Sequence, residues 1–506
     1  MIIESKIIKS IFQVYILSQS KLFSEASANA TPHNGRPLVV DLDGTLIHTD
    51  MLHESAIRLL RDKPHFILAI PFWLLGGKAM LKQKLAHHVN SDITSLPFNQ
   101  QLIDWLSSQK DLGRKLVLCT ASDKSIAKAI ANHLKLFDEV IASEGVANLA
   151  GKNKANVLVE KYGGNGFDYV GNSSVDLLVW EKSKQGVVVN GSSRLVDQAS
   201  AVTQIEHIIS KDKNSLKTWV KVFRLHQWIK NILIFVPIFA AHQVITSELW
   251  INLGLAFLSF SLCASSVYVA NDLLDLESDR THPRKRSRPF ASGQIPIWIG
   301  AILAPVLILS SLVMAQYVGG NFLPWLLVYF GLTCAYSWGL KRLVLVDCLT
   351  LAILYTLRIV AGAAAVSVPL SFWLLAFSIF LFLSLAFIKR YAELQAQPNG
   401  GSNKVHGRGY YLDDAPLVQQ LGITSGYAAT LVLALYLNSE NVIKLYRTPE
   451  MIWGAVPLML LWISWMWLKA HRGLMHDDPI VFAIKDKVSI LIGALFMAIL
   501  ILARVW

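Results

Sequence analysis

The stretch Asn271-Asp272-Leu273-Leu274-Asp275-Leu276-Glu277-Ser278-Asp279-Arg280 decides how the second half of this chain folds and what it binds. Its three aspartates are spaced i, i+3 and i+7, so on a continuous helix they line one face within reach of one another. Three neighbouring carboxylates repel unless a cation joins them. Mg²⁺ fits, because it takes one or two protein carboxylates and completes its octahedron with water and phosphate oxygens. The spacing predicts a magnesium site for a diphosphate; a solvated helix end is the alternative.

The sequence on both sides of this stretch is strongly apolar. Of the 506 residues 53% are hydrophobic and 16% charged, whereas a soluble chain is about 25% charged. Beyond Lys230 the apolar residues form nine stretches, each long enough to cross ~30 Å of hydrocarbon. We therefore predict an all-α membrane domain of nine transmembrane helices, near 232–247, 251–270, 297–316, 322–338, 348–366, 371–388, 421–438, 451–468 and 488–505.

The basic residues between these stretches predict the topology. Lys and Arg crowd the connections after the second, fourth, sixth and eighth spans, whereas the opposite connections hold only Lys444 and Arg447. By the positive-inside rule the basic connections and the N-terminal half face the cytoplasm. We expect an integral protein of the inner (plasma) membrane with a cytoplasmic N-terminal domain. This pattern explains most of the net charge of +12 without nucleic acid, and it leaves the oligomeric state open.

Several basic residues of the second half are candidates for binding phosphate. The segment Thr281–Pro289 follows the acidic stretch directly, and its guanidinium groups could clamp phosphate bidentately or act only as a topology signal. Arg358 lies inside an apolar span, where an arginine costs about 2.5–3.5 kcal/mol and usually faces a cavity or a partner. A structural pair with a buried carboxylate is its alternative role. Lys389 and Arg390 could likewise bind phosphate, or they could act only as a topology signal, as in Thr281–Pro289.

These motifs resemble those of the UbiA superfamily of intramembrane prenyltransferases. The stretch Asn271–Arg280, followed by Arg288-Pro289-Phe290-Ala291-Ser292-Gly293, resembles the first aspartate-rich motif, and Tyr336–Lys341 with Asp347 resembles the second. The resemblance covers about 215–506 and implies nine helices. It also implies Mg²⁺ on the aspartates Asp272, Asp275, Asp279 and Asp347. The substrate-binding residues that we carry over are Asn271, Arg280, Lys285, Arg286, Arg288, Lys341, Arg358, Lys389 and Arg390.

One branch of that superfamily is favoured by four further segments. The segments His282–Pro289, Gln227–Asn231, Leu357–Ala363 and Lys389–Leu394 are similar to those of polyprenyl-phosphate phosphoribosyltransferases. In that branch the donor is phosphoribosyl pyrophosphate and the acceptor is polyprenyl phosphate, so the lipid attacks the sugar. Two alternatives stay open. One is an aromatic prenyltransferase that takes a polyprenyl diphosphate donor and an aromatic acceptor, and the other is a membrane-anchored phosphatase whose helical half only binds lipid.

The N-terminal half carries a second set of acidic residues. Pro37–Leu46 is a short apolar run that ends in Asp41-Leu42-Asp43-Gly44. On a strand the two aspartates would point to opposite faces, so the chain must turn between them for both to reach one ligand. This run resembles the first motif of the haloacid dehalogenase superfamily. The resemblance implies that Asp41 is the nucleophile that becomes an aspartyl phosphate, and that Asp43 is the general acid and base.

Three further motifs of that superfamily follow in order along the chain. Lys115–Ser122 ends in Thr120, expected to hold phosphate, and Lys154 is the expected cation. In Val170–Asp176 the resemblance implies that acids bind Mg²⁺, with Asp176 joining Asp41 and Asp43. Asn172 stands where an aspartate is common. The resemblance covers about 36–195 and implies an α/β, Rossmann-like parallel sheet with the motifs at its carboxyl edge.

These observations together predict the layout of the chain. We expect an N-terminal extension over 1–35, a phosphatase domain over 36–200, a linker with an amphipathic helix over 201–225, and the membrane transferase domain over 226–506. The segment from Met51 to Leu112 is expected to form a small helical cap. The fusion suggests that the phosphatase removes the 5-phosphate from the lipid product. The four cysteines of the chain are predicted to be core residues. No motif in the sequence indicates haem, flavin, nicotinamide or zinc.

Overall fold

The computed structural model describes residues 35–89, 92–144, 149–210, 215–240, 246–396, 408–439, 446–475 and 478–505. Nearly all of the expected N-terminal extension lies outside these residues. The chain divides into two compact units. Unit 1 contains the chain up to Lys213 together with Leu276–Ser287 and Ala291–Ile297, and unit 2 contains Asn214–Asp275, Arg288–Phe290 and Trp298–Trp506.

Unit 1 is built on a six-stranded sheet whose neighbouring strands are all parallel, in the order β3-β2-β1-β4-β5-β6. This confirms the expected Rossmann-like α/β sheet. Both faces of a parallel sheet are normally covered, so its strands are continuously apolar, as in the fully buried β1 and β5. The strands are β1 Leu38–Val40, β2 Leu116–Asp123, β3 Glu139–Ser143, β4 Asp168–Gly171, β5 Gln185–Val189 and β6 Gln204–Ile209.

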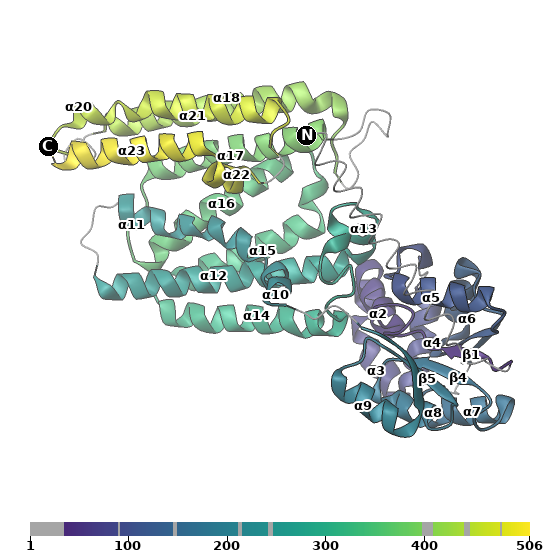
Figure 1. The fold of residues 1–506 in the computed structure, drawn as a ribbon. Helices are drawn as coiled ribbons and strands as arrows, with labels where there is room; N and C mark the ends of the chain where they lie inside the picture. Colours follow the sequence, from purple (N-terminus) through teal and green to yellow (C-terminus); the bar gives the residue numbers. More distant parts are fainter. Residues whose placement is uncertain are drawn as a thin grey trace. The chain divides into compact units, whose positions relative to one another are not determined.

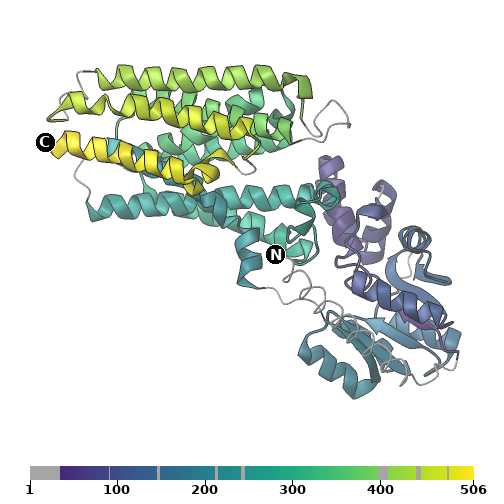
Figure 2. The same cartoon turned by 45° about the horizontal axis from the view of Figure 1, so that its top comes forward.

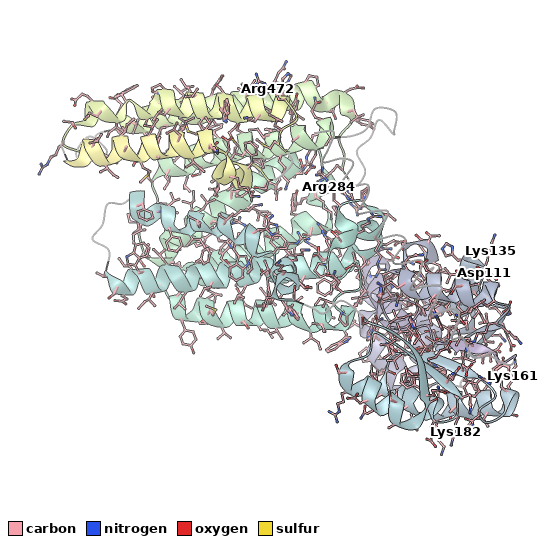
Figure 3. The ribbon with its side chains drawn as sticks, in the orientation of Figure 1. Asp111, Lys135, Lys161, Lys182, Arg284 and Arg472 are labelled. Atoms are coloured by element: carbon pink, nitrogen blue, oxygen red, sulfur yellow. The ribbon has the colours of Figure 1, made fainter. Side chains whose placement is uncertain are left out.

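Helices cover both faces of this sheet (Figure 2). Successive residues of a strand point to opposite faces. Leu38 and Val40 accordingly join one hydrophobic cluster, which includes α5 (Gln100–Asp111) and α6 (Lys124–Leu134). Val39 joins the other cluster, against α7 Lys152–Tyr162, α8 Leu177–Trp180 and α9 Ser193–Val202. Charged side chains such as Lys161 and Lys182 project outward from this unit (Figure 3).

The helical cap between β1 and β2 is shorter than the expected range Met51–Leu112, because α5 within that range packs on the sheet. It contains α2 (Met51–Asp62), a 3-10 turn over Pro64–Leu68, α3 (Ile70–Leu75) and α4 (Lys78–His88). These helices have a small core of their own, made of Leu59, Leu81, Leu85 and Val89. The cap is therefore a separately packed layer that follows directly from the turn after β1.

The stretch expected to be a linker contains more structure than its sequence indicated. β6 (Gln204–Ile209) pairs in parallel with β5 and forms the edge of the sheet. A seven-residue helix, α10 (Leu216–Val222), follows. The sequence of β6 alternates only weakly between apolar and polar residues, as edge strands with one solvated face often do, so its pattern does not distinguish it from a linker.

Unit 2 is helical, and its long helices lie side by side (Figure 1). Two hydrophobic clusters form its core, one around α16, α17, α18 and α21, the other around α12, α15 and α16. The helices are α12 Ser247–Leu274, α14 Ile297–Val318, α15 Phe322–Trp338, α16 Val346–Ala365, α17 Phe372–Gln395, α18 Ala415–Leu437, α21 Ala455–His471, α22 Pro479–Lys485 and α23 Lys487–Val505; α20 (Pro449–Ile452) is a single turn.

The expected number of nine transmembrane helices is not confirmed. Among the described residues, six helices are long and apolar enough to span a membrane, or seven if α22 and α23, bent by 81°, form one span. α15 is apolar but shorter. In place of a span over 232–247 the chain has a 3-10 helix, η4 (Leu225–Phe235), followed by the five-residue α11 (Val236–Ala240). Residues 241–245 lie outside the described ranges.

A glycine allows η4 to pack closely against α16. A Cβ built on Gly362 would lie 2.0 Å from the carbonyl oxygen of Ile234, far inside any real contact distance. Only a residue without a side chain fits there. This close approach keeps η4 in the interior of unit 2, where Lys230 and Asn231 are buried.

Candidate active sites

The motif residues of unit 1 converge where the parallel strands end. Asp41 follows β1 directly, Thr120 lies near the end of β2 and Asn172 follows β4. The chain turns after Asp41 as expected, through Gly44 at φ +75°, and a Cβ on Gly44 would lie 2.2 Å from Nδ2 of Asn172. Glycine is therefore required for the turn and for the close approach of the β4 loop. The carboxyl edge of the sheet holds the site, as in other open α/β folds.

Asp41 is buried and tied to the expected cation. Lys154 Nζ donates to Asp41 Oδ1 at 2.6 Å and to the hydroxyl of Tyr169 at 3.0 Å, and that hydroxyl donates to Asp176 Oδ1 at 2.9 Å. Burial raises the pKa of Asp41 and the charge of Lys154 opposes the rise. Burial alone would lower the pKa of Lys154, but the Asp41 carboxylate raises it. The carboxyl group of Asp41 is therefore in direct contact with the ammonium group of Lys154.

Asp43 is held in a different environment, although it lies two residues away. Its Oδ1 accepts from the backbone N–H of Met51 at 2.8 Å, and its Oδ2 accepts from Ser122 Oγ at 2.7 Å. Burial, together with the negative charges of Asp50 and Asp41, raises the pKa of Asp43 to about 7. A carboxyl group with a pKa near 7 can both donate and accept a proton near neutral pH.

Thr120 and Asp176 hydrogen-bond to the backbone of the segments around this site. Thr120 is fully buried and its hydroxyl accepts from the backbone N–H of Ser122. Asp176 Oδ2 accepts from the N–H groups of Asn172 and Ser173 and from the Ser173 hydroxyl, so this carboxylate organises the β4 loop. Ser122, which contacts Asp43, was not among the expected residues; its place two positions after Thr120 in the same motif was the available signal.

In unit 2, Asp272 lies buried near the end of α12 between two arginines. Its Oδ1 accepts from Arg288 Nη1 at 3.0 Å, and it also pairs with Arg224. Asn271 Nδ2 donates to Ser337 Oγ at 2.8 Å, and Asp275 Oδ2 lies 4.0 Å from Lys341 Nζ. The two expected motifs therefore meet here, because Ser337 and Lys341 belong to the second one. Arg224 was not predicted, since it precedes both motifs.

The remaining residues of the first motif belong to unit 1. The side chain of Asp279 is buried and its Oδ1 lies 3.9 Å from Lys285 Nζ. Arg280 is largely buried and donates to both carboxylate oxygens of Glu54, at 3.1 and 2.6 Å. Arg286 is exposed. Because α12 ends at Leu274 and a new helix, α13 (Leu276–Thr281), follows it, the three aspartates do not lie on one continuous helix.

Asp347 and Arg390 form a buried pair deep in unit 2. Both side chains are almost completely inaccessible, and Arg390 Nη2 lies 2.5 Å from Asp347 Oδ2. The hydroxyl of Tyr410 donates to Asp347 Oδ1 at 2.7 Å, and Arg390 also pairs with Glu393. Burying two charges is tolerated only when they are paired and hydrogen-bonded. In this arrangement the pair joins α16 to α17.

Arg358 is held by polar and aromatic partners. Its Nε donates to Asn231 Oδ1 at 2.8 Å, and its Nη2 donates to the hydroxyl of Tyr329 at 3.0 Å. Its guanidinium also lies 4.9–5.6 Å from the ring centroids of Tyr329, Tyr355 and Phe260. Cation–π contacts of this kind stabilise a desolvated cation. Arg358 therefore has the polar and aromatic partners that an arginine inside an apolar span needs. Among its described contacts there is no carboxylate, so the expected alternative of a buried ion pair is not seen there.

A cluster of two lysines and one aspartate lies near Arg358. Lys230 Nζ is 2.6 Å from Asp478 Oδ2, and Lys389 Nζ is 3.9 Å from the same oxygen. The hydroxyl of Tyr355 donates to Asp478 at 3.1 Å. Lys389 was expected at the site, whereas Asp478 was missed because it lies far along the chain from the quoted motifs. Two ammonium groups share one carboxylate, so the cluster carries excess positive charge.

Magnesium is chemically compatible with both sites, although no three His, Cys, Asp or Glu side chains gather as a metal site among the described residues. In unit 2, Asp272 and Asp275 offer the hard carboxylate oxygens that Mg²⁺ prefers. In unit 1, Asp41 Oδ2 accepts a long hydrogen bond of 3.4 Å from Thr45, so a cation could replace that contact. The Asp176 oxygens accept four hydrogen bonds and are less suited to direct coordination.

Comparisons with known proteins agree with this division of the chain. The profile described as "UbiA prenyltransferase family" matches residues 232–479. The chain is 36% identical over 470 residues to "Uncharacterized protein y4nM" of Sinorhizobium fredii, covering 92% of this chain and 91% of that protein. It is 32% identical over 282 residues to a decaprenyl-phosphate phosphoribosyltransferase of Mycolicibacterium smegmatis, covering 54% of this chain and 89% of that enzyme.

Among solved structures, one similar chain is a HAD-family hydrolase from Salmonella enterica serovar Typhi. It is 16% identical, has a TM-score of 0.27, and covers 35% of this chain and 67% of its own length.

Proposed function

Because this chain belongs to the UbiA prenyltransferase family, we propose that unit 2 transfers phosphoribose from phosphoribosyl pyrophosphate to polyprenyl phosphate and that unit 1 is a phosphatase. The observation that carries the first part is the sequence similarity to a decaprenyl-phosphate phosphoribosyltransferase over 89% of that enzyme's length. The segments that resemble this branch include Arg358 and Lys389, both placed among buried polar partners.

The arginines around Asp272 suit a diphosphate leaving group. Arg224 and Arg288 both pair with one carboxylate, and a diphosphate would offer these guanidinium groups several more oxygens. In the proposed reaction an oxygen of the lipid phosphate bonds to the anomeric carbon of ribose, and the bond from that carbon to diphosphate breaks. The acceptor is already ionised, so the reaction needs no strong general base.

Asp272 and Asp275 are the residues that would hold Mg²⁺ in unit 2. A bound Mg²⁺ neutralises the charge that develops on the departing diphosphate. Lys341, 4.0 Å from Asp275, adds positive charge on the same side. Asp279 remains a predicted ligand. Asp347 was predicted as a ligand as well, but it contacts Arg390 and Tyr410, so we expect its role to be structural.

The lysine cluster is our candidate for the second phosphate group. Lys230 and Lys389 share the single carboxylate of Asp478, and an additional phosphate would balance the remaining charge. Both the 5-phosphate of the donor and the phosphate of the lipid acceptor are suitable. The KM of Lys389→Gln for each substrate distinguishes them, because the variant should weaken only the substrate whose phosphate it contacts.

For unit 1 the geometry supports hydrolysis of a phosphate ester through a covalent intermediate. An oxygen of Asp41 attacks phosphorus and displaces the alcohol, whose oxygen takes the proton of Asp43. Asp43 then removes a proton from the water that hydrolyses the aspartyl phosphate. Lys154 donates to Asp41 and would place a positive charge beside the incoming phosphate. Asp41 is the residue that would contribute a carboxylate ligand if Mg²⁺ is bound here.

The fusion of the two units gives a consistent pair of reactions. Unit 2 would make polyprenylphosphoryl-5-phosphoribose, and unit 1 would remove its 5-phosphate. This requires both sites on one side of the inner membrane, and the distribution of Lys and Arg favours the cytoplasmic side. The apolar helices and the family membership support an integral membrane protein.

A paired assay on membranes that contain the protein tests the transfer. One reaction receives labelled phosphoribosyl pyrophosphate and polyprenyl phosphate, the other labelled prenyl diphosphate and 4-hydroxybenzoate, each with Mg²⁺. We expect labelled lipid from the first only, and Asp272→Asn should lower its rate by roughly 100-fold or more. Product from the second alone would instead support the aromatic prenyltransferase, which family membership keeps as the second candidate.

A second assay tests the phosphatase. Release of phosphate from synthetic lipid-linked 5-phosphoribose should require Asp41, so Asp41→Asn abolishes it while Asp272→Asn leaves it intact. If generic phosphoesters are cleaved but the lipid-linked substrate is not, the proposed physiological substrate is wrong.

A further inference from the structure

The cap of unit 1 contains a short segment that is apolar on two sides. The segment, Pro64–Leu75, comprises the 3-10 turn and α3. On its inner side Phe66, Ile70 and Trp73 pack against the core of the cap, and the ring of Trp73 lies 5.4 Å from that of His88. These three residues are enough to attach the segment to α2 and α4.

The outer side of the same segment exposes large apolar side chains. Leu68, Phe72 and Leu75 are 75%, 71% and 86% exposed, and their i, i+4, i+7 spacing forms a stripe. Unit 1 has ten exposed large hydrophobic side chains in its described residues, and five of them lie between Leu68 and Met80. A helix that is apolar all round is normally buried in protein or in a membrane.

The charges around this stripe indicate which partner covers it. From Lys63 to Val89 the sequence contains four lysines and three histidines, and no aspartate or glutamate. Lys63 and Lys84 are exposed. Apolar side chains next to lysines are the signature of a segment that lies in a membrane interface, with the cations at anionic lipid headgroups. A bilayer is always within reach, since the same chain carries membrane-spanning helices.

We propose that the outer face of Pro64–Leu75 inserts into the interfacial layer of the membrane that holds unit 2. Leu68, Phe72 and Leu75 enter the boundary of the acyl chains, and Lys63 and Lys84 contact lipid phosphates. The cap thereby becomes a membrane-bound part of the phosphatase. One consequence rests on the proposed function: the phosphatase takes a lipid-linked phosphoester directly from the bilayer surface.

Site-specific fluorescence quenching in the full-length protein tests the insertion. Cys119, Cys263 and Cys348 are buried, so replacing the partly exposed Cys334 by Ser leaves a background with little labelling. Leu75→Cys then receives an environment-sensitive fluorophore in vesicles that contain lipid spin-labelled near the headgroup. Leu112→Cys is the matched control, because Leu112 is 69% exposed and lies at the end of α5, outside the cap. We expect roughly threefold or greater quenching at position 75 than at 112.

Two outcomes would overturn the proposal. Equal quenching at the two positions would mean that the stripe stays in water. A shielded fluorophore without lipid quenching would mean that protein covers the face. The double variant Lys63→Glu with Lys84→Glu should reduce the quenching at position 75. Neutral vesicles should reduce it as well. Both changes remove the attraction between the lysines and anionic lipid.

Kinetic measurements on variants of the cap test membrane insertion separately from the proposed phosphatase activity. Phe72→Glu with Leu75→Glu should raise the KM for the lipid-linked substrate about tenfold and leave hydrolysis of p-nitrophenyl phosphate unchanged. Leu112→Glu should change neither. Strong quenching in a protein without any phosphatase activity would support insertion and contradict the proposed function, whereas activity without quenching would do the reverse.

Discussion

Asp43 is the residue of unit 1 whose chemistry depends most on pH. Burial and the charges of Asp50 and Asp41 raise its pKa to about 7, so its protonated form is lost as the pH rises through 7. Transfer of phosphate to Asp41 consumes that proton, and the initial release of alcohol should therefore slow by about tenfold per pH unit above 7. Rapid-quench kinetics measure this burst. A burst rate that stays constant from pH 6 to 9 would contradict the role of Asp43 as the acid.

Tyr169 is a positioning residue in the same site. Tyr169→Phe removes the hydroxyl that joins Lys154 to Asp176, and a buried donor or acceptor left without its partner costs about 1–3 kcal/mol. We expect kcat of the phosphatase to fall about tenfold with a smaller change in KM, and transfer by unit 2 to be unaffected. Tyr162→Phe is the control, since its hydroxyl donates to Glu139 instead. Equal effects of the two substitutions would show a merely structural role.

The sequence predicted which residues belong to the candidate sites better than it predicted which of them contact one another. The motifs located Asp41, Asp43 and Lys154. The structure brings Lys154 to Asp41, and it brings Ser122, from the motif that contains Thr120, to Asp43. Arg224 and Asp478 were missed, because neither belongs to a quoted motif and only folding places them beside Asp272 and Lys230. The assignments of substrate and metal residues stay predictions that the variants above can test.

The packing of η4 on α16 gives a prediction at the element scale. Gly362→Ala places a methyl group against the carbonyl of Ile234, and overpacking of this kind typically costs about 1–3 kcal/mol. We expect a lower midpoint of thermal unfolding in detergent and reduced transfer. Gly254→Ala is the matched control in α12, where a Cβ meets nothing within 4 Å and alanine favours the helix. A drop in the midpoint for both variants would show that any change of glycine destabilises these helices.

Elements were predictable where their pattern was strong. The buried strand β1, the cap helices and the long apolar helices follow from hydrophobic runs and periodicity. β6 was not predicted, because a weakly alternating edge strand resembles a linker. The expected first span is not confirmed, for a different reason. Apolar length predicts a straight helix, but tertiary packing of Lys230 and Asn231 in the interior holds this stretch as a 3-10 helix instead.

For the whole molecule, the presence of two units with separate cores predicts that their activities can be separated. Asp41→Asn and Asp272→Asn, reconstituted together in one vesicle, should form dephosphorylated lipid product, because a lipid intermediate can diffuse between molecules in the same bilayer. Chromatography of the labelled lipids measures this product. If the mixture stops at the phosphorylated lipid while the unaltered protein does not, the intermediate is retained within one molecule.

The pairing of Asp272 with Arg224 and Arg288 has a consequence for the order of events in unit 2. An aspartate that already holds two cations is a poor trap for a third one arriving alone. A donor that brings its own negative charge would draw the arginines away from the carboxylate and leave it open to a metal ion. We therefore expect the resting site to bind a cation and a diphosphate that arrive as one complex in preference to free metal.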